Sequence, residues 1–285
     1  MEKSTKGLNL ESTQVTYVRP PRPWNGIHLR ELWDYRELLD ALIRRDLTVR
    51  YKQTLVGVVW VLGQPLLTTI VLSYLLTRVA GEAQGGIPYP IYVYVALVPW
   101  AYFSHALTKA TVCFIDQWEL VARVYIPRLL IPLGTSLAAL VDFGVAFLFI
   151  PPLLIFYRVA PSWKLLALPA MILLLLGATL GIGLWLASLN AEYRDIAFAL
   201  PFLLQMGLFM TPMFYSSEII PMPWRVLYAL NPMVGVVEGM RWSLLNAQFS
   251  DPLTIFAGST FSTLAILGIG LYAFQRREPY LADVI

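Results

Sequence analysis

The 285-residue sequence is poor in charged residues, cysteine and histidine, and each shortage excludes a class of protein. Charged residues make up 14% of the chain and apolar residues 58%, whereas an average soluble domain is about 25% charged. This excludes a disordered chain and an ordinary cytosolic enzyme. The lone Cys113 excludes an internal disulfide and a cysteine metal site, and His28 and His105 are too few for a histidine-rich zinc site. The net charge of +3 is too small to indicate nucleic-acid binding.

The catalytic motifs that a single sequence can reveal are also missing. The sequence has no phosphate-binding G-x-x-x-x-G-K-[ST] loop, no H-E-x-x-H and no G-x-S-x-G. We therefore expect a chain that is not an enzyme, has no metal or cofactor site, and depends on another protein for any energy it uses.

Apolar stretches dominate what remains, and several reach the roughly 20 residues that cross a bilayer as a helix. The mean hydropathy is +0.63. We predict an all-α integral membrane protein with six transmembrane helices, at about residues 56–77, 90–108, 129–150, 165–189, 196–217 and 254–275. The third span should leave the membrane near Pro151 and Pro152. Residues 219–237 contain three prolines and Arg225, which favours a re-entrant or interfacial hairpin covered by protein.

The basic residues predict how the chain is oriented. An even number of spans places both termini on one side, and the cytoplasmic side carries the excess of Lys and Arg. With both termini inside, the inner segments hold sixteen Lys and Arg and the outer segments five. We therefore expect a multi-pass protein of the cytoplasmic membrane with both termini in the cytoplasm.

An amphipathic helix is predicted before the first span. Apolar residues recur at helical spacing over residues 29–50, and the basic residues Arg44, Arg45, Arg50 and Lys52 lie at its end, beside Asp46 and Tyr51. Such a helix lies in the cytoplasmic interface, where it either only anchors the first span to anionic lipid or also contacts a soluble partner. Residues 1–28 form a polar, proline-containing tail that is either a flexible linker or a docking peptide.

The segment between the second and third spans is short and charged. Asp116 and Glu119 precede Arg123 and Arg128, which is the order that a helix dipole favours. We predict about three helical turns that end before Pro127. This helix is either a lever that transmits force or a solvated connector.

Two features inside the predicted spans remain open from the residues alone. Asp142 and His105 have no ionisable partner at helical spacing, so each is either hydrogen-bonded structure or part of a functional path. Aromatic residues cluster around the second span. They form either a belt at the lipid headgroups or a path for sugars, whose candidate residues are Tyr92, Tyr94, Trp100 and Tyr102.

Five ordered motifs over residues 29–277 resemble the ABC-2 type permeases, in particular their Wzm-like branch, which exports polysaccharides and polyol phosphates. The first is the Arg44-Arg45-Asp46-Leu47 segment with Arg50-Tyr51-Lys52-Gln53-Thr54, Gly57, Trp60, Gln64 and Pro65. The second is the segment from Arg123 to Arg128, where Arg123 and Ile126 replace the usual lysine and phenylalanine. The later motifs are Tyr193-Arg194-Asp195-Ile196, Thr211-Pro212-Met213-Phe214-Tyr215, and Asn231-Pro232-Met233 with Glu238 and Arg241.

The resemblance implies a division of the chain and a set of partners. Residues 29–55 would be an interface or gate helix, residues 56–277 the transmembrane domain with outer gate helices between spans five and six, and residues 278–285 a cytoplasmic tail. The family implies a homodimer in membrane lipid with two copies of a separate ATPase, which binds ATP and magnesium. The segment around Asp116, Glu119, Arg123, Tyr125, Pro127 and Arg128 would be the coupling helix.

The substrate that the resemblance implies is a lipid-linked glycan of the O-antigen or teichoic-acid type, exported across the cytoplasmic membrane. An ABC-2 exporter of small molecules or drugs remains an alternative. A membrane scaffold or an enzyme that modifies lipid-linked sugars is a further alternative, although an enzyme would need a carboxylate cluster at the end of a span, and the sequence has none.

Overall fold

The computed structural model describes residues 33–52, 57–80, 84–123, 126–248 and 251–278, and over these residues the protein contains helices and no strands. The side chains of residues 57–61, 79–80 and 121–123 are outside the description. The predicted tail, residues 1–28, also lies outside the described residues. The all-helical prediction is confirmed for the part of the chain that the structure covers.

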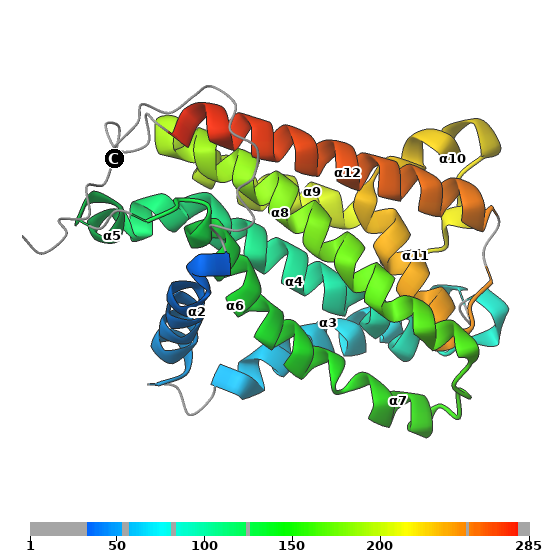
Figure 1. Ribbon diagram of the computed structural model, residues 1–285. Helices are drawn as coiled ribbons and strands as arrows, with labels where there is room; N and C mark the ends of the chain where they lie inside the picture. Colours follow the sequence, from blue (N-terminus) through cyan, green and yellow to red (C-terminus); the bar gives the residue numbers. More distant parts are fainter. Residues whose placement is uncertain (1–32, 53–56, 81–83, 124–125, 249–250, 279–285) are drawn as a thin grey trace, which may run out of the picture.

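Helix α4 (Tyr89–Asp116) is the central element of the bundle (Figure 1). It packs against α3 (Gly57–Ala80), α6 (Leu130–Phe147), α8 (Leu168–Glu192) and α11 (Pro232–Leu245). Of its most apolar window, 78% is buried, against 22% to 28% in the other candidate spans. Most of α4 is therefore surrounded by protein, which fits its lower hydropathy and its many aromatic side chains.

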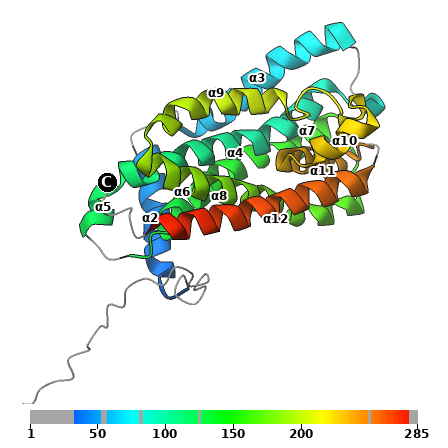
Figure 2. The same ribbon diagram turned by 90° about the horizontal axis from the view of Figure 1, so that it is seen from above.

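Helices α8 and α12 (Pro252–Arg277) run side by side along one flank of the bundle (Figures 1 and 2). Their backbones approach most closely at Gly181 and Gly270. A Cβ atom on Gly270 would overlap the carbonyl group of Gly181. Small residues allow the backbones of membrane helices to pack closely, so these two glycines determine how closely α8 and α12 approach.

Among the described residues, four helical segments are long and apolar enough to cross a membrane: Tyr89–Asp116, Leu130–Phe156, Trp163–Glu192 and Pro252–Arg277. The chain is thus a multi-pass membrane protein. The second of these segments joins α6 to α7 (Ile150–Phe156), and the third joins η2 (Trp163–Ala167) to α8. Pro151 and Pro152 stand in the first turn of α7, where a missing N–H costs nothing. They begin a helix there, whereas the sequence indicated the end of a span.

Two more helices correspond to the remaining predicted spans. Helix α3 covers the first, and α9 (Asp195–Phe209) covers the fifth over 15 residues. At 1.5 Å per residue α9 is about 22 Å long, which is shorter than the predicted 196–217. The helix ends just before Thr211, whose position ahead of Pro212 disfavours helical dihedrals. The following residues turn back toward α4.

The proline-rich segment after α9 forms a hairpin of α10 (Met222–Ala229) and α11, preceded by η3 (Ser217–Ile219). An ion pair of 2.7 Å joins Arg225 to Asp251, immediately before α12 begins. The hydroxyl of Ser259 donates to the carbonyl of Ala229 (3.0 Å) and accepts from the backbone N–H of Gly235 (3.0 Å). Ser259 lies eight residues beyond Asp251, so the tip of the hairpin is about 12 Å deep along α12.

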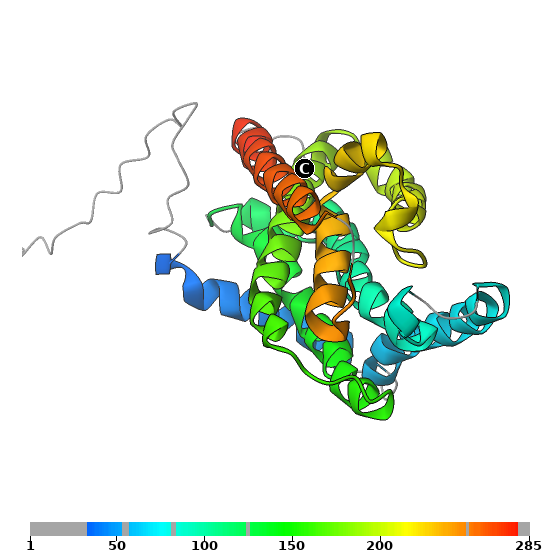
Figure 3. The same ribbon diagram turned by 90° about the vertical axis from the view of Figure 1, so that its right-hand side faces the viewer.

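Helix α2 (Arg36–Tyr51) lies at the opposite end of the bundle and runs crosswise to most of the helices (Figures 1 and 3). Leu42 is buried against Gly134 of α6, whereas Asp40 and Arg44 face solvent. A helix with a buried and an exposed side thus covers residues 36–51, against the predicted 29–50, and its place in a membrane interface stays a prediction. Helix α5 (Trp118–Arg123) and the C-terminal end of α12 lie at the same end as α2 (Figure 1).

Candidate functional site

A cleft of about 800 Å³ opens between α2, α5, α6 and the end of α4. It brings together residues from the two segments that the sequence predicted as interface helix and coupling helix. Three basic and three acidic side chains line it: Arg45, Arg50, Lys109, Asp46, Asp116 and Glu119. The mixed charge and the half-exposed ring of Trp118 at its edge suit contact with protein better than with a simple anion.

Arg50, in the last turn of α2, joins three helices. Its Nη1 donates to Asp142 of α6 in a close ion pair, and its Nη2 lies 2.6 Å from Nε2 of His105 on α4. The neighbouring Tyr51 hydroxyl donates to the other carboxylate oxygen of Asp142. Asp142 and His105 thus have a shared partner, which the sequence did not reveal because it lies on another helix. Burial lowers the pKa of the Arg50 guanidinium.

Most of the other predicted interface residues are more exposed than Arg50, although Asp46 is not. Arg44 pairs with Asp40 at 2.7 Å, one turn earlier on α2, and Arg45 pairs with the adjacent Asp46 at 2.9 Å. Lys52 follows the helix, and its backbone N–H donates to Thr48. These contacts are local to α2, so only Arg50 and Tyr51 of the predicted set reach the bundle in the described contacts.

The predicted coupling segment is divided into two parts. Helix α4 continues to Asp116, a break follows at Gln117 with φ −116°, and α5 then covers six residues. The expected three-turn helix is therefore one short helix attached to the end of α4. Pro127 and Arg128 are half-buried in the turn before α6, while Tyr125 and the side chain of Arg123 lie outside the described residues.

The four candidate glycan-path side chains lie inside the protein. The hydroxyl of Tyr94 donates to the carbonyl of Ala146 at 2.9 Å, and that of Tyr102 donates to the carbonyl of Ser136 at 3.3 Å. Trp100 packs against α9, next to Gly207. Since Tyr92 is buried as well, a headgroup belt does not account for these rings. Their role in a glycan path stays a prediction.

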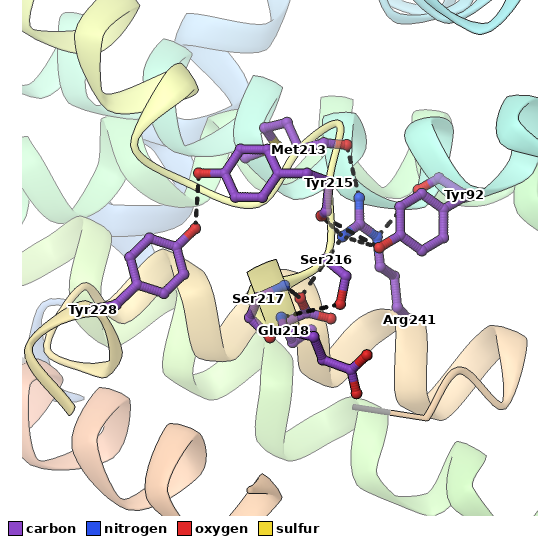
Figure 4. A network of polar contacts seen from close by, with 9 residues as sticks. Tyr92, Met213, Tyr215, Ser216, Ser217, Glu218, Tyr228 and Arg241 are labelled. Atoms are coloured by element: carbon purple, nitrogen blue, oxygen red, sulfur yellow. Dashed lines mark hydrogen bonds and ion pairs between the residues drawn. The ribbon is translucent and has the colours of Figure 1, made fainter. Parts of the chain in front are cut away.

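A second polar cluster surrounds Arg241 of α11, whose side chain is fully buried (Figure 4). Its Nη2 donates to the carbonyl of Met213 at 2.7 Å and its Nη1 to the carbonyl of Tyr215 at 3.2 Å. The guanidinium also lies over the ring of Tyr92, 3.6 Å from its centre, and donates to the Tyr92 hydroxyl at 3.0 Å. Arg241 therefore holds the chain after α9 against α4.

Glu238 completes this cluster one turn before Arg241. Its Oε1 lies 4.0 Å from Nη1 of Arg241 and accepts the backbone N–H of Ser217 at 2.9 Å. The hydroxyls of Tyr215 and Tyr228 are 3.1 Å apart and join the same loop to α10 (Figure 4). Sequence reasoning noted Glu238 and Arg241 only as part of a family motif. Their charge within an apolar segment was a signal that a site lies there.

Comparison with known proteins shows the family of the chain. The family model "ABC-2 type transporter" matches residues 37–245. The "O-antigen export system permease protein RfbA" of Myxococcus xanthus is 27% identical over 90% of this chain and 98% of its own length. A protein of the same name from Klebsiella pneumoniae is 24% identical over 87% and 95%. The "Polysialic acid transport protein KpsM" of Escherichia coli is 24% identical over 84% and 93%. Because the model matches well over half of the residues, the chain belongs to the ABC-2 type transporter family.

Proposed function

We propose that the chain is the permease subunit of an ATP-binding-cassette exporter that moves a lipid-linked polysaccharide across the cytoplasmic membrane. The observation that carries this proposal is the similarity, over nearly the whole chain, to permeases named for O-antigen export and polysialic acid transport. A glycan of the O-antigen or teichoic-acid type fits these names and the family resemblance of the sequence.

In this proposal six segments cross the membrane, with α3 and α9 as the first and fifth. The end that carries α2 and α5 faces the cytoplasm, as the excess of Lys and Arg favours. The hairpin of α10 and α11 then enters the membrane from the outer side as a pair of gate helices. Its buried polar contacts satisfy the irregular backbone that membrane depth otherwise forbids.

The proposed exporter is a homodimer with two copies of a separate ATPase, which binds ATP and magnesium. ABC-2 type permeases work with an ATP-binding partner, and the charged cleft between α2 and α5 is the docking surface that we assign to it. Apolar side chains exposed on α3 and α9, among them Ile70, Val71, Phe198 and Phe202, face lipid or the second copy. One protomer is too small to enclose a route for a hydrated polymer.

The experiment that tests the function compares the glycan in the two leaflets of the membrane. Cells without this gene should accumulate lipid-linked glycan on the cytoplasmic side and lack it at the surface, and the wild-type gene should restore export. Normal surface glycan combined with new sensitivity to toxic small molecules would instead favour the drug exporter. Unchanged distribution of an altered glycan would favour the sugar-modifying enzyme.

A further inference from the structure

The contact between Arg50 and His105 connects α2 to α4. The two planar arms of the guanidinium serve different helices, since Nη1 pairs with Asp142 on α6 while Nη2 reaches Nε2 of His105 at 2.6 Å. The side chains of Arg50 and Asp142 are 25% and 15% exposed, so water screens this pair less than it screens Arg44 and Asp40 at the surface.

The chemistry of the contact fixes the state of His105. A guanidinium has only donors, so Nε2 must accept the hydrogen bond and the imidazole must be neutral with its proton on Nδ1. A protonated imidazole would present a donor to Arg50 and add a second positive charge, with Lys109 one turn away on the same helix. The contact therefore requires an acceptor at position 105, and this requirement makes it open to a specific test.

The position of the contact relative to the cleft gives it a mechanical consequence. From His105, α4 continues without a break to Asp116, which is 11 residues or about 16 Å, and α5 follows after one residue. Over that distance the cleft of about 800 Å³ separates α2 from α4 and α5. Elsewhere α2 rests on α6, where Leu42 meets Gly134. Helix α2 also contacts α3, and Leu38 packs against the apolar cluster that includes Cys113 and Phe114 of α4. Arg50 adds to this packing a charged contact that joins α2 directly to α4 beside the cleft.

We propose that Arg50 is a positioning residue that links α2 to α4 through His105, so that movement of α5 driven by the ATPase also moves α2. The inference rests on the proposed function, because it assigns α5 to the ATPase contact. The proposal also assigns a role to Asp142. Its carboxylate balances the charge of Arg50 and orients the guanidinium so that Nη2 faces His105.

The test uses the complete complex of this chain and its ATPase in proteoliposomes and measures glycan export per ATP hydrolysed. His105→Phe keeps a ring but removes the acceptor, whereas His105→Gln keeps an acceptor. Arg36→Gln removes the same charge as Arg50→Gln from an exposed position at the other end of α2. We expect export per ATP to fall about tenfold in His105→Phe and Arg50→Gln, within the range of coupling between distinct sites. His105→Gln and Arg36→Gln should remain near the wild-type value.

The results that would overturn the proposal are equally specific. Wild-type export per ATP in His105→Phe, or equal losses in His105→Phe and His105→Gln, would show that the hydrogen bond transmits nothing. Failure of both His105→Phe and Arg50→Gln to assemble, with normal assembly of His105→Gln, would reduce the contact to a role in folding. If the wild-type complex exports no glycan, the proposed function fails instead. The stimulation of ATP hydrolysis by each variant then decides the coupling role, with the same variants expected to lose it.

Discussion

Replacement of Arg241 by methionine should destabilise the protein strongly, because it removes the centre of a buried polar cluster and takes away the donors and the positive charge that its partners share. Methionine occupies the space of the aliphatic part of arginine but has no N–H groups. The carbonyls of Met213 and Tyr215 would lose their contacts of 2.7 and 3.2 Å, and Glu238, which is 1% exposed, would lose the adjacent positive charge.

The expected cost follows from the burial of both charges. Removal of one partner of a buried ion pair costs about 3–5 kcal/mol, since the other charge stays buried without compensation. A single neutral hydrogen bond between membrane helices contributes only about 0.6 kcal/mol on average. Tyr92→Phe keeps the ring beneath the guanidinium but removes a hydroxyl that accepts from the charged Arg241 at 3.0 Å and donates to the carbonyl of Tyr215 at 3.3 Å, so it should cost more, about 1.5–3 kcal/mol.

A second variant separates the unpaired charge from the lost contacts. Glu238→Gln keeps an oxygen that accepts the N–H of Ser217 but removes the negative charge. The double variant of Glu238→Gln with Arg241→Met should have a free energy of unfolding about 1–3 kcal/mol higher than that of Arg241→Met alone, because the effects of two substitutions in one polar network are not additive.

The assay is the free energy of unfolding of the purified chain in mixed micelles. Arg158→Met supplies the control, since it makes the same replacement at an exposed residue after α7. Two results would refute the argument that Glu238 and Arg241 compensate each other's buried charge. One is a loss of unfolding free energy below about 1 kcal/mol in Arg241→Met. The other is strict additivity of the losses in Arg241→Met and Glu238→Gln.

Four further predictions follow from the structure and the proposed function. Reversal of charge at Glu119 and Arg123 together should lower the stimulation of the ATPase while the chain still inserts normally, and wild-type ATPase activity in the reconstituted complex would contradict it. Native mass spectrometry of the active complex should show two copies of this chain and two of the ATPase, whereas one copy of the chain would exclude the homodimer. Tyr94→Phe and Tyr102→Phe should each cost about 1 kcal/mol of unfolding free energy, because each removes one hydroxyl contact, and measurement of export per folded complex will show whether these hydroxyls also act on the glycan. Gly270→Leu should lower stability by about 3 kcal/mol or more, because the new side chain overlaps α8, and an unchanged unfolding free energy would contradict the close approach of the two helices.

The order of the helices and the amphipathic character of α2 follow from the sequence because hydrophobic periodicity and run length are local properties. The ends of the helices were less predictable. The apolar run in the second span stops near Thr108, but residues 109–116 contain neither proline nor glycine, so α4 continues to Asp116. The fifth span was predicted too long because the apolar residues continue past Phe209 while the helix does not.

The polar clusters lay beyond sequence reasoning for a different reason. The partners of Arg50 are 55 and 92 residues away, and Arg241 meets Tyr92 across 149 residues. No local pattern encodes such pairings. The sequence analysis singled out Asp142 and His105 as ionisable residues in apolar surroundings and noted Glu238 and Arg241 only within a family motif, and all four have partners in the structure. The sequence alone did not give the packing of α4 against the neighbouring helices, and this packing determines which side chains contact each other.

Two arginines from distant parts of the chain contact α4, one near its start and one near its middle; Arg241 is fully buried, and the Arg50 side chain is 25% exposed. Arg50 of α2 meets it at His105, and Arg241 of α11 meets it at Tyr92. These contacts are 13 residues, or about 20 Å, apart along one continuous helix. A charge buried at membrane depth is costly unless it is paired, so each arginine resists separation from α4 more strongly than an apolar contact of similar size. Displacement of α4 along its axis must therefore either carry α2 and the α11 hairpin with it or break one of these charge contacts. Pro99 lies between the two contacts and leaves one backbone carbonyl of the helix without its usual partner. Bending at Pro99 would let the two parts of α4 move separately while both arginines remain paired.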